Sequence, residues 1–221
     1  MILDPAMSTA LVELDGARRA GCVDLCVAMP ADVVVARLAA SPRWAHKVGV
    51  RWVFDGAPNV DVVPVEAGDE SPLMVDGWSL SRVGMGSVIS MAVPLVGAPR
   101  DIRLAPIPSI VLMKMVAFLD RPQAREKDRG DVRWIVERYA RDTDRVVDFW
   151  QARVELDLGL DEAGAWLLGR DMAAGMSTLA VDRVRAFVEQ MTGADRLLDD
   201  RDPLVRLLPC LWEGLSEALR G

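Results

Sequence analysis

Histidine and cysteine are scarce in this sequence of 221 residues. The only histidine is His46, and the three cysteines are Cys22, Cys26 and Cys210, an odd number without CxxC spacing. Such a set favours neither a disulfide framework nor a zinc site, because both need several cysteines or histidines at characteristic separations. His46 also has no companion for a catalytic triad, so we assign it no role.

Long apolar runs are missing as well. The longest one, at 88–96, is interrupted by Pro94 and is much shorter than the ~20 residues that a membrane-spanning helix needs. The first residues contain Asp4, Glu13 and Asp15, where an export signal would have a positive start and an unbroken apolar stretch. We therefore expect a cytoplasmic protein with no membrane partner.

The composition is that of a globular protein. Apolar residues make up 51% of the chain and charged residues 27%, which leaves enough apolar side chains to fill a core. The net charge of -7 would repel a polyanion at long range, so contact with a nucleic acid would need a local basic patch.

The spacing of the apolar residues changes near residue 105. Before it, the pattern predicts a strand, a helix that Pro30 starts, a hairpin, a loop with one short helix, and further strands, at 21–27, 30–39, 48–54 with 60–65, 66–86, and 87–96 with 101–104. After it, the spacing predicts helices that include 109–119, 131–139, 144–153, 161–175, 180–191 and 203–219. The order predicts an α+β fold, with a sheet core at 1–105 and a helical region at 106–221.

Two aspartates interrupt apolar strand segments. Asp24 lies in the first predicted strand, and Asp61 lies in the run NVDVVP at 59–64. Burying an ionised carboxylate without a partner is costly, so each position needs an explanation. If the two strands are neighbours, both carboxylates could face the same side and grip Mg²⁺ together with nucleotide phosphates. Alternatively, each lies at a strand end in water.

Lys114 is the only charge in the apolar stretch 107–119. A helix that is apolar nearly all round is buried, so this ammonium must meet a carboxylate, a phosphate or a route to water. A phosphate is a natural partner. The alternative is a lysine that extends from a core helix to the solvent.

A charged run, REKDRGD at 125–131, opens the next helix. Asp128 and Asp131 are three residues apart and share a face, where the helix dipole favours acidic groups. Such a cluster is commonly an ion-paired helix start. With Arg121, Arg129 and Arg133 it could also form a basic rim that binds a triphosphate or an RNA backbone.

The stretch around these residues resembles the C-terminal signature of AbiEii/AbiGii-type nucleotidyltransferases. That signature has a lysine in an apolar helix, a short loop and an RxKDxxD segment, here Lys114 followed by 125–131. The strand NVDVVP resembles the one that carries the third metal carboxylate. The run LLGRDM at 167–172 resembles a helix start in bacterial predicted nucleotidyltransferases of this group.

The resemblance implies a nucleotidyltransferase-like mixed sheet followed by a C-terminal helical bundle that completes the active-site cleft. It implies that Asp24 and Asp61 bind Mg²⁺, that Lys114 contacts nucleotide phosphates, and that Asp131 supports or activates the acceptor. These four residues form the expected catalytic set. The expected nucleotide-binding set is Arg19, Lys114, Arg121, Arg125, Lys127 and Asp128.

The N-terminal motif departs from that family. The family has a Gly-Gly or Gly-Ser turn and then a strand with two metal-binding aspartates, whereas Cys22 stands here in the place of the first aspartate, and no such glycine pair precedes it. A thiolate is a poor ligand for Mg²⁺, so metal binding should be weakened. A start site chosen too late, which would shorten the sheet core at its N-terminus, or a genuine pseudo-enzyme would each explain the departure.

These observations predict transfer of a nucleoside monophosphate from an NTP to an RNA, such as tRNA, or to a protein, as in toxin–antitoxin systems with a cognate antitoxin. The charged groups at 24, 61, 114 and 131 would then converge in one cleft. One alternative is a catalytically degenerate protein that binds a nucleotide or a partner chain. Another is a helical interaction module without a ligand, which the apolar surroundings of Lys114 disfavour.

Overall fold

The chain forms two compact units, Met1–Ala105 and Pro106–Gly221, and each is described by itself. The structure is a computed structural model, and it describes residues 22–55, 59–95, 103–139, 146–193 and 198–221. The fold is α+β, with a small mixed sheet in the first unit and helices in the second.

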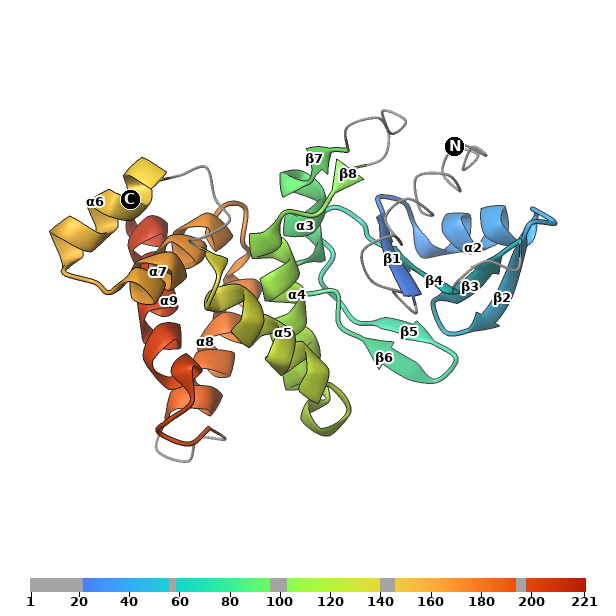
Figure 1. Ribbon diagram of the computed structural model, residues 1–221. Helices are drawn as coiled ribbons and strands as arrows, with labels where there is room; N and C mark the ends of the chain where they lie inside the picture. The colour runs from blue at the N-terminus through green and yellow to red at the C-terminus, as the bar shows by residue number, and fades with distance from the viewer. Residues whose placement is uncertain (1–21, 56–58, 96–102, 140–145, 194–197) are drawn as a thin grey trace. The chain divides into compact units, whose positions relative to one another are not determined.

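A four-stranded sheet is the centre of the first unit (Figure 1). Its strands lie in the order β1-β4-β3-β2, where β1 and β4 are parallel and the other neighbouring pairs are antiparallel. The hairpin predicted from the turn formers near 55–59 is present as β3 and β4. The sheet elements are β1 (Cys22–Val27), β2 (Trp44–Val48), β3 (Arg51–Phe54) and β4 (Asn59–Pro64).

Helix α2 (Ala31–Ala39) follows β1 and packs on one face of this sheet. Pro30 precedes its first turn, where a proline costs no hydrogen bond. The buried cluster between helix and sheet comprises Val34, Leu38, Trp52, Val60 and Val62. Because side chains alternate along a strand, the residues between these positions face the opposite side.

The stretch between this sheet and residue 95 differs from the sequence prediction. A hairpin of β5 (Leu73–Val75) and β6 (Trp78–Leu80) lies where a loop was expected. Its turn residues Asp76 and Gly77 both have positive φ, 49° and 76°, as a type I′ turn requires, and Asp-Gly is a favoured pair for that turn.

Helix α3 (Met85–Met91) lies where a strand was expected. The β-branched residues of this segment favoured a strand, but Gly84 adopts φ 79° and places the chain at a helix start. Ser87 and Val88 are buried on one side of the helix, so tertiary packing overrides the local preference. Two short strands follow, β7 (Val93–Pro94) and β8 (Arg103–Leu104).

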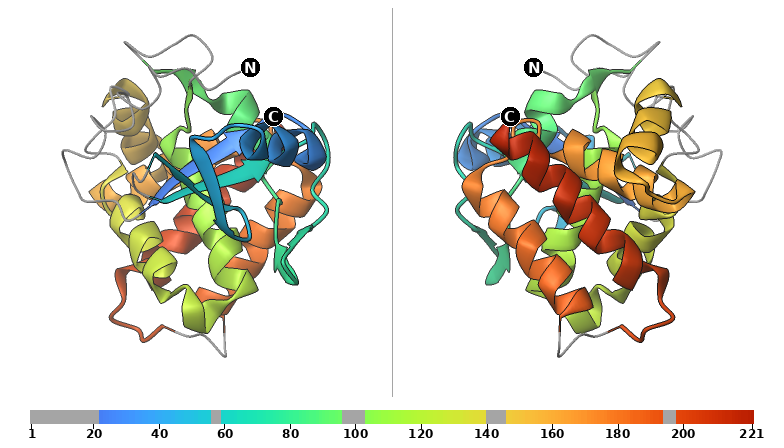
Figure 2. Two further views of the ribbon diagram at one scale, coloured as in Figure 1. Left: turned by 90° about the vertical axis from the view of Figure 1, so that its right-hand side faces the viewer. Right: turned by 90° about the vertical axis from the view of Figure 1, so that its left-hand side faces the viewer.

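In the described part of the second unit the regular elements are all helices (Figure 2), and the helical spacing predicted each of the α-helices. They are α4 (Ile107–Asp120), α5 (Glu126–Val136), α6 (Val146–Leu156), α7 (Leu160–Met172), α8 (Thr178–Thr192) and α9 (Pro203–Arg220), with a 3₁₀ turn, η1 (Pro122–Ala124), before α5. Within the ranges described above, no helix is both long enough and apolar enough to cross a membrane.

Two glycines allow α7 and α9 to pack backbone against backbone. A Cβ atom added at Gly169 would lie 1.9 Å from the carbonyl oxygen of Leu211, and one added at Gly214 would lie 2.0 Å from that of Trp166. Such distances are far below van der Waals contact, so no other residue fits without moving a helix.

We expect Gly214→Ala to destabilise the protein by about 1–3 kcal/mol or more, because the new methyl group meets a backbone atom that cannot rotate away. Urea denaturation monitored by circular dichroism measures the change. Gly130→Ala in α5 is the matched control, since a Cβ there has nothing within 4 Å. That control should gain about 0.5–1 kcal/mol from helix propensity. A Gly214→Ala protein as stable as the parent would refute the close packing.

Candidate functional site

Asp24 and Asp61 lie side by side on neighbouring strands. The strands β1 and β4 are parallel, and Asp24 is the register partner of Asp61. Val60 and Val62, on either side of Asp61, are buried against α2, so both carboxylates face away from that helix. The Asp24 residue is exposed, whereas the Asp61 side chain is only 20% exposed. The sequence predicted that the two carboxylates would share a face if their strands were neighbours, and the strands are neighbours.

Arg51 extends this pair into a row of three charged residues. It is the register partner of Asp61 across the antiparallel pair β3 and β4. Its Nε donates to Oδ1 of Asp61 at 2.7 Å, and its Nη2 donates to Oδ2 at 2.7 Å, so the guanidinium engages both carboxylate oxygens. Arg51 was not predicted as a site residue, although opposite charges at facing positions of the predicted hairpin are a usable signal.

Cys26 is the next residue on the same face of β1. Burial raises the pKa of its thiol to about 11, and the negative charge of Asp24 adds to the rise. The thiol therefore stays protonated at neutral pH and is a poor nucleophile there. Cys22 begins β1, but its side chain lies outside the described residues, as does the whole of Arg19.

The carboxylate pair fits Mg²⁺ only as part of a nucleotide complex. Where the structure describes side chains, it shows no cluster of three or more histidine, cysteine or acidic residues that could hold a metal ion. Mg²⁺ nevertheless commonly binds through one or two carboxylates and completes its octahedron with water and substrate phosphates. Asp24 and Asp61 could supply those two carboxylates. Arg51 opposes them, because it occupies the oxygens of Asp61 that a cation would use.

In the second unit, Lys114 joins α4 to the start of α5. Its Nζ lies 2.6 Å from Oδ2 of Asp131 and 3.1 Å from Oδ1 of Asp128. Partial burial alone would lower the pKa of Lys114, but hydrogen bonds to the two aspartates and their charges outweigh this effect and raise it. The sequence left a carboxylate, a phosphate or a route to water as partners of this ammonium, and the structure shows two carboxylates. Arg125 adds a fourth charge, with Nη1 at 3.5 Å from Oδ2 of Asp128.

This cluster is partly buried. The side chains of Asp128, Lys114 and Asp131 are 12%, 26% and 33% exposed, respectively. Asp128 and Asp131 share a face because they are one helical turn apart. The sequence allowed an ion-paired helix start as one alternative, and the start of α5 is ion-paired. The cation that contacts both Asp128 and Asp131 is Lys114, which comes from a different helix, α4.

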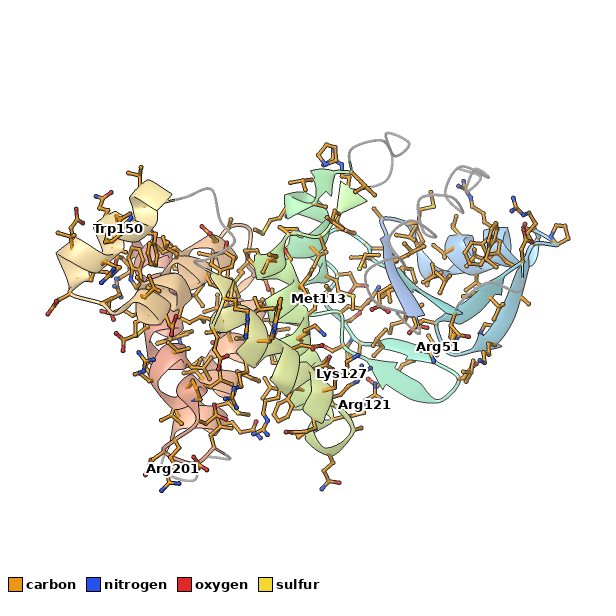
Figure 3. All side chains as sticks on the ribbon, viewed as in Figure 1. Arg51, Met113, Arg121, Lys127, Trp150 and Arg201 are labelled. Carbon is orange, nitrogen blue, oxygen red and sulfur yellow. The ribbon has the colours of Figure 1, made fainter. Side chains whose placement is uncertain are left out.

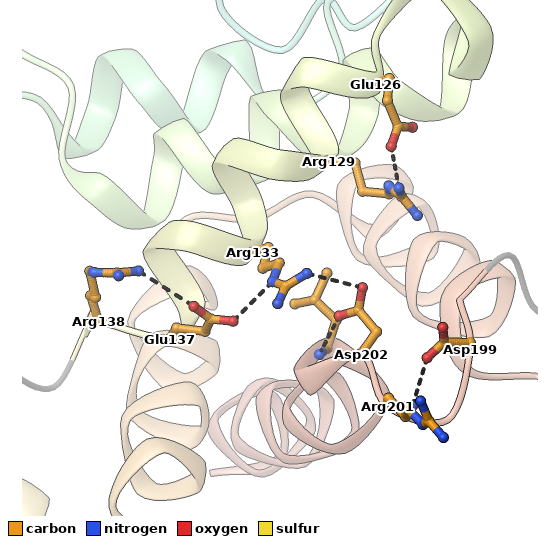
Figure 4. A network of polar contacts seen from close by, with 9 residues as sticks. Glu126, Arg129, Arg133, Glu137, Arg138, Asp199, Arg201 and Asp202 are labelled. Carbon is orange, nitrogen blue, oxygen red and sulfur yellow. Dashed lines mark hydrogen bonds and ion pairs between the residues drawn. The ribbon is translucent and has the colours of Figure 1, made fainter.

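Much of the predicted basic rim is already paired with acidic groups (Figure 4). Arg129 forms an ion pair with Glu126. Arg133 contacts Glu137 at 3.0 Å and Asp202 at 3.4 Å. These contacts neutralise two of the three arginines expected to form the rim. Two further residues of the expected nucleotide-binding set, Arg121 and Lys127, are exposed (Figure 3).

The structure thus forms two local groups from the expected site residues. Asp24 and Asp61 are together in the first unit, and Lys114, Asp128 and Asp131 are together in the second. The convergence of the two groups in a single cleft stays a prediction. Comparisons of this chain with protein-family models, curated proteins and solved structures found no match.

We expect Lys114→Met to lower the free energy of unfolding by roughly 1–3 kcal/mol, because two half-buried carboxylates lose their charge-assisted hydrogen bonds. Since the folded-state pKa of Lys114 is raised, its contribution is complete below the unfolded-state pKa of about 10.4 and is lost as pH rises through the higher folded-state value.

Denaturant titrations of the parent and Lys114→Met proteins between pH 7 and the alkaline range test both statements. Lys127→Met is the control, because it removes an exposed lysine nearby and should change stability by less than about 0.5 kcal/mol. A Lys114→Met penalty that grows above pH 10 would contradict the assignment.

The Cys26 thiol should react with iodoacetamide in a strongly pH-dependent way. In a Cys22→Ser/Cys210→Ser protein, we expect the alkylation rate to reach half of its maximum at about pH 11, because half of the thiol is ionised there. Asp24→Asn should shift this midpoint downwards by removing a neighbouring negative charge. A midpoint at the ordinary value of about 8.5 would contradict the burial of the thiol.

Proposed function

We propose that this protein is a nucleotidyltransferase that binds an NTP with Mg²⁺ at Asp24 and Asp61 and transfers the nucleoside monophosphate to an acceptor. One observation carries the proposal: two aspartates, 37 positions apart by their numbers, are register partners on parallel neighbouring strands and face the same side. Like charges at facing positions of a sheet cost stability. The ion pair of Asp61 with Arg51 offsets part of this cost, and a cation held between the two carboxylates would offset more of it.

In the proposed reaction, a hydroxyl oxygen of the acceptor attacks the α-phosphorus of the NTP. The new oxygen–phosphorus bond forms as the bond between the α-phosphorus and the bridging oxygen breaks, and pyrophosphate leaves with the electron pair. Bound Mg²⁺ would supply positive charge to the phosphate oxygens. Asp24 and Asp61 would hold that ion, and Lys114 would bind phosphate oxygens as a point charge.

Asp131 is the proposed acceptor of the hydroxyl proton. Its contact with Lys114 at 2.6 Å holds the carboxylate in position. The two carboxylates take two of the three N–H donors of Lys114, which leaves one donor for a phosphate oxygen. The basic side chains of Arg121 and Lys127 are exposed at the same turn and suit an RNA acceptor such as tRNA, while the charge of -7 suits a protein acceptor or a basic antitoxin partner.

A second candidate function is nucleotide or partner binding without transfer. Two observations favour it: Arg51 already holds both oxygens of Asp61, and Cys22 stands where the related nucleotidyltransferase motif has its first aspartate. A row with two carboxylates and one guanidinium has a single net negative charge, which holds a divalent cation weakly.

Labelled nucleotides separate the two candidates. We expect purified protein with Mg²⁺ and each α-labelled NTP to transfer label to total tRNA or to a protein acceptor from a cell extract. Asp61→Asn should reduce transfer by about 100-fold or more, because it removes half of the carboxylate pair. Saturable nucleotide binding without transfer would establish the second candidate in its nucleotide-binding form. Neither binding nor transfer would reject the nucleotidyltransferase and the nucleotide-binding form alike.

Asp55→Asn is the matched control for Asp61→Asn. Asp55 also pairs with an arginine of the first unit, Arg43, and asparagine tolerates its positive φ of 46°. This variant should keep full transfer. In addition, Cys22→Asp restores the missing carboxylate, so a gain of transfer would show that this position limits activity.

A further inference from the structure

The central position of Asp61 makes its partner on β3 part of the proposed site. Asp24, Asp61 and Arg51 are successive register partners across β1, β4 and β3, so they form one row on one face of the sheet. Asp61 has a carboxylate on one side and a guanidinium on the other. A cation bound by the two aspartates would therefore lie close to a like charge.

The Arg51–Asp61 contact has the geometry of a competitor for metal binding. The two hydrogen bonds, both 2.7 Å long, come from Nε and Nη2 and end on different carboxylate oxygens. This side-on fork takes one lone pair of each oxygen and places a positive charge beside the lone pairs that remain. Arg51 must therefore leave before Asp61 can bind a metal ion through both oxygens, and while it stays its charge weakens binding through one oxygen.

Release of Arg51 is feasible because the pair is not enclosed. The Arg51 side chain is 39% exposed, so the guanidinium can turn away without opening the apolar cluster on the other face of the sheet. A planar guanidinium that leaves a carboxylate finds an equivalent partner in the paired oxygens of a phosphate. A triphosphate bound beside Asp61 would provide that partner.

We propose that Arg51 couples metal binding to nucleotide binding: in the free protein it competes with a cation for Asp61, and in the complex its guanidinium moves to the phosphate oxygens of the NTP. This inference rests on the proposed function, because it requires a triphosphate at the Asp24–Asp61 pair. Its consequence is that free Mg²⁺ binds weakly and that Mg²⁺ and nucleotide bind cooperatively. Arg51 is thus a positioning residue that selects the metal–nucleotide complex over either component.

The test measures binding of Mn²⁺, a spin-active substitute for Mg²⁺, by electron paramagnetic resonance, and binding of ATP, GTP, CTP and UTP by calorimetry with and without Mn²⁺. In Arg51→Gln, we expect free Mn²⁺ to bind about tenfold more tightly, because the competing charge is gone. The enhancement of nucleotide affinity by Mn²⁺ should fall by a similar factor.

Arg43→Gln is the matched control. It removes an arginine that forms an equally short ion pair, with Asp55 at 2.6 Å, in the same unit. This variant should leave both affinities unchanged. If Arg51→Gln does not fold, Arg51→Lys serves instead, since lysine keeps the charge but cannot hold both oxygens. Its Mn²⁺ affinity should lie between those of the parent and an unblocked site.

The outcomes separate this inference from the proposed function. Nucleotide binding with an unchanged Mn²⁺ affinity in Arg51→Gln would overturn the inference and leave the proposed function standing. Equal losses of both affinities together with a lower Tm would overturn it too, because they would indicate a purely structural ion pair. A parent protein that binds no nucleotide with or without Mn²⁺ would reject the proposed function itself, and the coupling with it.

Discussion

The parallel pairing of β1 with β4 is the constraint on which the first unit depends. It sets Asp24 directly beside Asp61, while the hairpin of β3 and β4 sets Arg51 on the other side of Asp61. Because strand residues alternate between faces, the same register that buries Val60 and Val62 against α2 forces these charges to the opposite face. Core packing and site geometry are thus fixed by one alignment of backbones.

The second unit handles its half-buried charges in a different way. Lys114 emerges from the apolar helix α4, and the cost of removing its ammonium from water is offset by two carboxylates at the start of α5. The contact links the middle of α4 to the first turns of α5. The same three side chains could serve either to stabilise the helix pair or to bind a phosphate. Lys114 alone therefore does not identify a nucleotide site.

Much of the fold follows from local patterns in the sequence. Helical spacing gave the helices of the second unit, and the aspartates in apolar strands pointed to a shared face. The missed hairpin had a readable Asp-Gly turn, whereas α3 depends on burial of Ser87 and Val88, which β-branched composition conceals. Arg51 was missed because its partner depends on the exact register of the predicted hairpin, which the turn formers near 55–59 indicate only approximately. No local pattern could supply the choice of Asp128 and Asp131 as partners of Lys114.

The glycine contacts between α7 and α9 have a mechanical consequence. Where two helices touch through main-chain atoms at Gly169 and Gly214, no side chain can change rotamer to absorb a displacement. We therefore expect α7 and α9 to move together as one rigid pair, so that a displacement of one helix also displaces the other. Motion within the second unit is then expected in helices that are held only by side-chain contacts. Helix α6 is an example, because its Val147 and Val154 are exposed and contribute little packing.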